Sequence, residues 1–250
     1  ATTDGQVYEV GDAHQTFTIQ SISKPITYGL ALEDRGYDRV LAKVGVEPSG
    51  EAFNSIRLTD DNRPFNPMVN AGAIACSGLI HRIAGAGAFE LIQEELGRFA
   101  GRPLALDSPV YESESATGDR NRAIAWMLRN YGILRGDVDA ILDVYFRQCS
   151  LLVTARDLAV MAATLANRGV NPVTQERIIS DQTVARTLSV MTSSGMYDYA
   201  GEWTYRVGIP AKSGVGGGII AALPGQLGLG VFSPLLDDHG NSVRGLQVCE

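Results

Sequence analysis

The serine and the lysine of the segment Gln20-Ser21-Ile22-Ser23-Lys24-Pro25 have the residue types and the spacing of a catalytic pair. Residues three apart at the start of a helix lie on one face, so the two side chains can meet. A lysine amine that burial keeps neutral can accept the serine proton, as histidine does in other hydrolases. We therefore expect Ser21 to attack a carbonyl carbon and Lys24 to act as its base.

The same pattern also has a purely structural interpretation. Ser-x-x-Lys is frequent by chance, because a serine often caps a helix while a lysine one turn later is solvated. Pro25 suits the first helical turn, which supports a helix start but not the chemistry. Taken alone, the motif favours the structural interpretation, and the chemical one needs a second half elsewhere in the chain.

Lys212-Ser213-Gly214 is a candidate for that second half. It lies just before a hairpin of two apolar strands expected over 217–232. Serine acylases of the penicillin-recognising class combine Ser-x-x-Lys at a helix start with Lys-Ser/Thr-Gly on a facing strand. The glycines beside Val215 would leave backbone N–H groups free to hold an oxyanion together with the N–H of Ser21.

The composition is that of an ordinary globular protein and argues against several functions. Of the 250 residues, 45% are hydrophobic and 20% are charged, and the net charge is −7. No basic stripe for nucleic acid is visible, and the three histidines and three cysteines form no metal-ligand cluster. Residues 213–236 are uncharged, but glycines and prolines favour a buried hairpin over a membrane span. We expect no metal, cofactor, nucleic acid or membrane partner.

The cysteines and the first residues suggest the compartment. The cysteines are distant from one another and form no CxxC motif, which is typical of buried thiols in a reducing environment. Residues 1–5 have neither the basic start nor the apolar stretch of a signal peptide. We therefore expect a cytoplasmic protein.

Strand-like patterns occupy the two ends of the chain and helical patterns the middle. Residues 107–118 are predicted to form a polar loop and residues 195–201 a turn. Strands are expected over 6–10, 16–19, 205–207, 217–223 and 227–232. Helices are expected over about 23–35, 40–44, 70–84, 88–99, 119–128, 137–149, 155–166 and 181–191.

This order of elements predicts an α/β (α+β) fold in which an antiparallel sheet lobe, built from the chain ends, is split by an inserted all-α lobe. We expect one domain over 1–250. Its sheet lobe would comprise about 1–40 and 203–250, and its helical lobe about 41–202.

Several motifs together make the chain resemble the serine-dependent glutaminase family over essentially its whole length. They are Gln20-Ser21-x-x-Lys24-Pro25, Glu47-Pro48-Ser49-Gly50, Asn66-Pro67-Met68-Val69-Asn70-Ala71-Gly72-Ala73-Ile74, Gly118-Asp119-Arg120-Asn121, Ser194-Gly195-Met196-Tyr197 and Ile209-Pro210-Ala211-Lys212-Ser213-Gly214-Val215. The resemblance implies a β-lactamase-like fold and the hydrolysis of L-glutamine to L-glutamate and ammonia through a γ-glutamyl-serine intermediate. A homodimer or homotetramer is expected.

The resemblance also implies the site residues. Ser21 would be the nucleophile, Lys24 its base, and Tyr145 and Tyr197 catalytic tyrosines that can relay protons. Glu114 would meet the α-amino group of the substrate, as a zwitterion requires. The substrate-binding residues would be Gln20, Ser21, Asn70, Glu114, Asn121, Tyr145, Tyr197 and Val215. Without the family spacing, Glu114 would be interpreted as a solvated carboxylate, Tyr145 as a core residue, Asn70 as a helix cap and Tyr197 as a turn aromatic.

Two features of the family lie outside this chain. The family has a leading segment with a further active-site tyrosine, and it continues into a helix beyond the position of Glu250. We expect both flanking segments to be missing here, and Tyr8 is not assigned the role of that tyrosine.

Two other functions remain open. A β-lactamase or D,D-peptidase would share both lysine motifs, although Val69-Asn70 stands where that class has Ser-Asp-Asn. A non-catalytic amide-binding domain would keep the pocket without turnover. A Ser-His-Asp hydrolase is not indicated, because the chain has no Gly-x-Ser-x-Gly segment.

Overall fold

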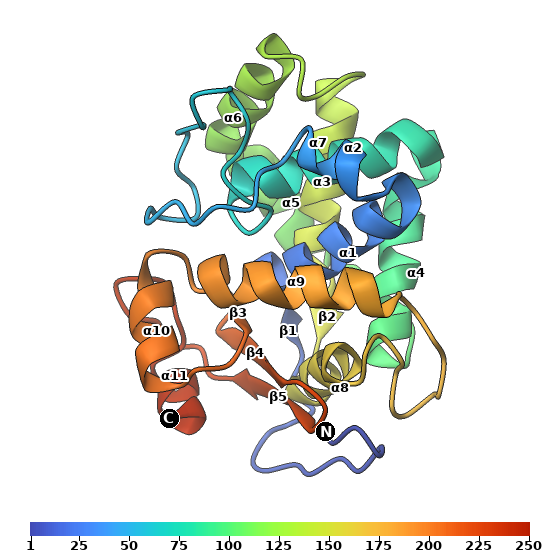
Figure 1. Cartoon of the computed structure of the whole chain (residues 1–250), viewed down its shortest axis with the longest axis vertical. Helices are drawn as coiled ribbons and strands as arrows, with labels where there is room; N and C mark the ends of the chain where they lie inside the picture. Colours follow the sequence, from blue (N-terminus) through green and yellow to red (C-terminus); the bar gives the residue numbers. More distant parts are fainter.

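Helix α1 (Ser23–Arg35) lies at the centre of the molecule, and every residue from Ser23 to Leu32 is buried. The structure, a computed structural model, describes residues 1–250. It places most of the helices on one side of α1 and the sheet on the other (Figure 1). A short 3-10 turn, Gln20–Ile22, leads directly into α1. The predicted catalytic pair therefore lies where the two halves of the molecule meet.

The helical half surrounds α3 (Asn70–Ala84), which packs against α1, α4, α6 and α7. Its small residues permit this close packing, because a Cβ atom on Gly72 would lie only 2.0 Å from the Asn66 carbonyl oxygen. The other helices of this half are α2 (Tyr37–Leu41), α4 (Ala88–Ala100), α5 (Ser108–Thr117), α6 (Asp119–Asn130) and α7 (Val138–Cys149).

The sheet half contains an antiparallel sheet of β3 (Ala211–Gly214), β4 (Gly218–Leu223) and β5 (Leu227–Phe232), in that order. A separate two-stranded pair joins β1 (Phe17–Thr18) to β2 (Leu152–Val153). Four more helices belong to this half of the chain: α8 (Ala155–Ala166), α9 (Asp181–Ser194), α10 (Ala200–Arg206) and α11 (Val243–Cys249). The mixture of helices and small antiparallel sheets confirms the predicted fold class.

Helix α8 packs directly on β4 and β5, although the expected lobe boundary placed it in the helical half. The contact is possible because β5 presents glycines to the helix. A Cβ atom on Gly230 would lie 2.3 Å from the Ala155 carbonyl oxygen and from the Ala159 nitrogen. No side chain can therefore separate the backbones of α8 and β5 at this point.

The substitution Gly230→Ala should destabilise the protein by about 3 kcal/mol, because the added methyl group forces the helix away from the sheet. The shift in the urea midpoint would measure this loss. Gly201→Ala is the matched control, since its Cβ atom would meet nothing within 4 Å and alanine suits the interior of α10. Equal midpoints for the two variants would contradict the close packing of α8 on β5.

The N-terminal strand prediction is wrong for residues 6–10, which form no strand, and only Phe17–Thr18 of the second run is a strand. Residues 1–3 instead pair with the start of β5 and the residue before it. The Gly228 N–H donates to the Ala1 carbonyl at 2.8 Å, and the Thr3 N–H donates to the Gln226 carbonyl at 2.9 Å. Tyr8 and Val10 are 77% and 97% exposed. The apolar side chains of the alternating pattern are therefore not buried against the rest of the protein.

The predicted loop over 107–118 is also wrong, because Ser108–Thr117 forms α5. Asp107 caps this helix by accepting a hydrogen bond from the Val110 N–H at 3.0 Å, and α5 packs on α7. None of its residues is buried, so no hydrophobic period marks it in the sequence. The strand expected over 205–207 lies at the end of α10 instead, and α11 forms where no helix was expected.

The first short helix lies earlier than predicted, at Tyr37–Leu41 rather than 40–44. One cluster of 50 buried apolar residues extends from Phe17 to Ala222 and so joins both halves of the molecule. No helix has both the length and the apolar character needed to span a bilayer.

Candidate active site

A pocket of about 180 Å³ opens beside the turn that precedes α1. Seven of the predicted site residues line it: Gln20, Ser21, Asn70, Glu114, Asn121, Tyr145 and Val215. The two others, Lys24 and Tyr197, lie against this lining, because the Lys24 ammonium donates to Asn70 and reaches Tyr197. The fold thus gathers into one place residues from α1, α3, α5, α6 and α7 and from the 3-10 turn of Tyr197 and the β3–β4 turn of Val215.

Ser21 is presented by a backbone turn with an unusual conformation. Gln20 has a φ of +49°, in the left-handed region that non-glycine residues rarely adopt. Its carbonyl accepts a hydrogen bond from the Ser23 hydroxyl at 2.7 Å. The turn is followed at once by α1, so the Ser21 side chain lies at the floor of the pocket and is only 8% exposed.

Lys24 is not solvated, being 1% exposed. Its Nζ donates to Asn70 Oδ1 at 2.7 Å and lies 3.5 Å from the Tyr197 hydroxyl. Burial lowers the pKa of Lys24 from 10.5 to about 7. A large fraction of this amine is therefore neutral near neutral pH, which is the state a general base needs.

Tyr197 lies between two buried lysines. Its ring centroid is 5.5 Å from Lys24 Nζ and 3.8 Å from Lys212 Nζ. Burial raises the pKa of the Tyr197 phenol, and a hydrogen bond with Ser21 acts in the opposite direction. The phenol is thus a neutral group that can pass a proton between Ser21 and Lys24.

Lys212 was recognised in the sequence only as part of a motif and was given no role. It is fully buried on β3, and its Nζ donates to the Ser213 carbonyl at 2.5 Å. Burial first, and then the charge of Lys24, hold the pKa of Lys212 well below 10.5. Both effects disfavour the charged form of this second buried amine.

Asn70 and Asn121 form a fixed amide pair on one wall of the pocket. The Asn70 amide donates to Asn121 Oδ1 at 2.9 Å while its own Oδ1 accepts from Lys24. Asn70 is the first residue of α3 and its side chain does not cap the helix. Both ends of the Asn70 amide are therefore committed, which fixes its orientation beside Ser21.

Glu114 supplies the only carboxylate of the pocket lining. It lies on α5, and its Oε1 accepts from Gln20 Nε2 at 3.3 Å. Most of its lone pairs are left for a ligand, since a carboxylate offers about four acceptor sites. This wall of the pocket is suited to a ligand with a positive charge.

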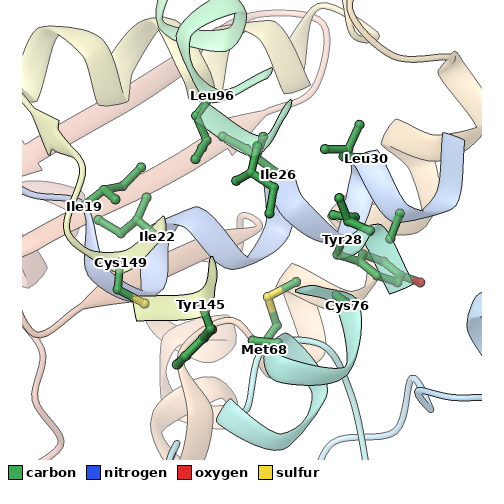
Figure 2. Packing of buried hydrophobic residues seen from close by; sticks show 14 of the residues in the cluster. Ile19, Ile22, Ile26, Tyr28, Leu30, Met68, Cys76, Leu96, Tyr145 and Cys149 are labelled. Atoms are coloured by element: carbon green, nitrogen blue, oxygen red, sulfur yellow. The ribbon is translucent and has the colours of Figure 1, made fainter. Parts of the chain in front are cut away.

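Tyr145 belongs both to the core and to the pocket wall. It is 3% exposed on α7, and Cys149 lies one turn further along the same helix. Figure 2 shows both side chains among the buried residues that pack around α1. Burial raises the pKa of Tyr145 well above 10, so its phenol stays protonated.

Four lining residues were missed in the sequence: Phe53, Asn54, Arg120 and Cys149. The connection between α2 and α3 brings in Phe53, whose ring packs 5.5 Å from that of Tyr197. Arg120 Nε donates to the Asn54 carbonyl at 2.6 Å and so ties this connection to α6. The Gly-Asp-Arg-Asn motif could have indicated Arg120, but an irregular loop carries no periodic signal for Phe53 or Asn54.

No group of three or more His, Cys, Asp or Glu side chains is arranged to hold a metal ion. The polar side chains that line the pocket are the Ser21 hydroxyl, the Tyr145 phenol, the Glu114 carboxylate, the Arg120 guanidinium and the amides of Gln20, Asn54, Asn70 and Asn121.

In a comparison of the sequence with known protein families, the family model "Glutaminase" matches residues 1–250. The chain belongs to the glutaminase family. The resemblance that the motifs indicated is thereby confirmed.

Individual relatives agree with the family assignment. Glutaminase 2 of Bradyrhizobium diazoefficiens is 74% identical over 249 residues, which cover 100% of this chain and 40% of the relative. The glutaminase of Microcystis aeruginosa is 56% identical over 250 residues, which cover 100% of this chain and 74% of the relative. The chain thus spans about two-fifths of the length of the first of these relatives.

Solved glutaminase structures have the same fold. The native form of Mglu matches with a TM-score of 0.95 at 50% identity, covering 100% of this chain and 61% of that one. The structure of Mglu in its glutamate form matches with a TM-score of 0.95, covering 58% of that chain. The fold that the family resemblance implied is therefore confirmed.

Proposed function

We propose that the chain hydrolyses L-glutamine to L-glutamate and ammonia. The observation that carries this proposal is the buried Lys24 amine, which is hydrogen-bonded to Asn70. Asn70 lines the same small pocket as Ser21 and its single carboxylate, Glu114. Its pKa of about 7 makes it a base at neutral pH. Membership of the glutaminase family supports the choice of substrate.

The pocket can bind a zwitterionic amino acid. The α-ammonium group of glutamine would pair with Glu114, and the α-carboxylate would accept hydrogen bonds from the amide of Asn121 and from the phenol of Tyr145. A volume of about 180 Å³ suits one amino acid rather than a peptide. The side-chain amide would then reach Ser21, which lines the same pocket.

The reaction proceeds in two steps. Ser21 Oγ attacks the side-chain amide carbon while its proton passes to Lys24, directly or through Tyr197. The backbone N–H groups of Ser21 and Val215 hold the oxyanion. The C–N bond breaks, the nitrogen takes the proton from Lys24 or Tyr197, and ammonia leaves a γ-glutamyl ester on Ser21. Water then attacks the ester, releases glutamate and returns the proton to Ser21.

The substitution Glu114→Gln should raise the KM for glutamine by about 30-fold while kcat changes little, because it removes a charged hydrogen-bond partner of the ammonium group. Steady-state ammonia release over a range of glutamine concentrations would measure both constants. Glu112→Gln is the matched control, as Glu112 is an exposed carboxylate on the same helix. An unchanged KM for the Glu114 variant would show that this carboxylate does not bind the ammonium group of glutamine.

A penicillin-recognising hydrolase and a non-catalytic amide-binding domain are the rival functions. Ammonia release on glutamine and on asparagine, with acylation by a labelled penicillin, separates them from a glutaminase. Thermal stabilisation by glutamine without ammonia release would favour the binding domain. Rapid acylation by penicillin would favour the β-lactamase or D,D-peptidase.

We further propose that residues 1–250 form one domain, that the protein acts in the cytoplasm, and that it assembles as a homodimer or homotetramer. The core that crosses both halves supports a single domain. The three cysteines are free thiols, which supports a reducing compartment. The homo-oligomer is proposed from the family resemblance.

A further inference from the structure

A chain of buried hydrogen bonds lies behind the nucleophile, outside the pocket. The Gln148 amide on α7 donates from Nε2 to Ser23 Oγ at 3.0 Å. Ser23 in turn donates to the Gln20 carbonyl at 2.7 Å. On the far side, the Ser77 hydroxyl on α3 shares its proton between the Ala73 carbonyl at 3.2 Å and Gln148 Oε1 at 3.4 Å. All three side chains are 0% exposed.

The chain ends on the residue whose backbone conformation presents Ser21. Gln20 has a φ of +49°, and a non-glycine residue keeps such a conformation only where the surrounding structure holds it. The Ser23 hydroxyl and the Ser23 N–H both donate to the Gln20 carbonyl. Because a hydroxyl has one proton, Ser23 then needs a donor for its own buried oxygen. Gln148 is that donor.

An amide at position 148 has no simple packing explanation. Burying an amide costs free energy unless its donor and its acceptor are both satisfied, and an apolar side chain of similar length would fill the same space. Gln148 Nε2 donates to Ser23 and Ser23 donates onward, so the hydrogen bonds run in one direction from Gln148 to the Gln20 carbonyl, while Ser77 contacts the amide oxygen. Gln148 lies next to Cys149 in the sequence but does not line the pocket.

We propose that Gln148 is a positioning residue for the nucleophile. Through Ser23 it holds the Gln20 carbonyl, and so fixes the turn that directs Ser21 Oγ toward the bound carbonyl carbon. The inference rests on the proposed function for the reaction that is positioned, but the reactivity of Ser21 can be measured without glutamine.

Gln148→Met keeps the length of the side chain and removes the donor. It should lower kcat for glutamine by about tenfold, because one lost hydrogen bond at this turn raises the barrier by about 1.4 kcal/mol. The KM should stay within about twofold, since no pocket residue is changed. The rate at which a fluorophosphonate labels Ser21, followed by intact-protein mass, should fall by about the same tenfold factor, as the phosphorus–oxygen bond forms and fluoride leaves.

A double-mutant cycle tests whether Gln148 acts through Ser23. Ser23→Ala is expected to lower the labelling rate to a similar degree, and adding Gln148→Met to it should change the rate by less than about twofold. Ser150→Ala is the matched control. It removes a hydroxyl that is equally buried, at the end of the same helix, and that bonds only to the Phe146 carbonyl. Its labelling rate should equal that of the wild type.

A pH profile gives a readout that loss of packing would not move. In Gln148→Glu, the buried carboxyl can donate to Ser23 only while it is protonated, so the labelling rate relative to wild type at the same pH should fall as pH rises through its raised pKa. In Gln148→Met, the rate relative to wild type should be the same at every pH.

Three results would overturn the positioning role. The first is a Gln148→Met protein with a lower Tm but an unchanged labelling rate per folded molecule. The second is a double-mutant cycle in which the effects of Ser23→Ala and Gln148→Met on the labelling rate multiply. The third is a wild-type protein that fluorophosphonate does not label at Ser21. A wild type that is labelled but releases no ammonia from glutamine would instead contradict the proposed function, and the ratio of labelling rates would still decide the role of Gln148.

Discussion

Replacing Ser21 with alanine is expected to lower glutamine hydrolysis by at least about 10⁴-fold, because the attacking oxygen is lost. No other group in the pocket can take its place. Burial raises the pKa of the Cys149 thiol to about 12, so this sulfur stays protonated at neutral pH. The phenols of Tyr145 and Tyr197 are held in their neutral form in the same way.

The loss should be confined to the chemical step. Glutamine binding by the Ser21→Ala protein, measured by calorimetry, should remain within a few-fold of the KM of the wild type, since Glu114, Asn70 and Asn121 are untouched. A variant that still releases ammonia within about tenfold of the wild-type rate would show that Ser21 is not the nucleophile.

Lys24→Met should have two opposite effects, a loss of activity and a gain of stability. The activity should fall by at least about 10³-fold, since no base remains beside Ser21. In the wild type, kcat/KM should rise with pH through about 7, where Lys24 loses its proton. The variant should lose this rise along with its activity.

The gain of stability follows from the direction of the pKa shift. The folded-state pKa of Lys24 is about 7, below the value of about 10.4 in an unfolded chain. The unfolded state therefore binds more protons between these values, and wild-type stability rises with pH across this window. Removing the amine should stabilise the protein by about 2 kcal/mol at pH 7 and below, and the difference should shrink as the pH approaches 10.

Urea unfolding at several pH values would measure this gain. A rise of stability with pH should persist in the variant, because burial also lowers the pKa of Lys212. Lys43→Met is the matched control, as Lys43 is half-buried and donates to the Gly132 carbonyl far from the pocket. A Lys24→Met protein that is less stable than the wild type at pH 6 would contradict a neutralised, desolvated lysine.

Local sequence signals were sufficient for the helices that carry clear caps or periods. The capping box of Thr154 and Asp157 marks the start of α8, and the apolar periodicity of residues 88–99 marks α4. Helix α5 was not predicted because all its residues are at least partly exposed and give no hydrophobic period. Contact with α7 and the Asp107 cap stabilise it instead. The strand expected over 6–10 failed for the opposite reason, since its alternating residues find no partner surface.

The site could be anticipated only where motifs carry it. Ser21 and Asn70 lie in such motifs, and the structure brings both to the lining of one pocket. Phe53 reaches the pocket from an irregular connection, where no local rule specifies its position. The role of Gln148 could not be predicted for another reason. Its partners Ser23 and Ser77 are distant in sequence, and they contact it only when α1, α3 and α7 pack together.

The central claim is that glutamine is hydrolysed through an ester on Ser21. Mixing the protein with isotope-labelled L-glutamine, quenching in acid within one turnover and mapping the peptides by mass spectrometry would test it most directly. We predict a γ-glutamyl adduct on Ser21 that hydroxylamine removes and that Ser21→Ala lacks. An adduct on another residue would contradict the account. So would rapid ammonia release with no adduct on Ser21.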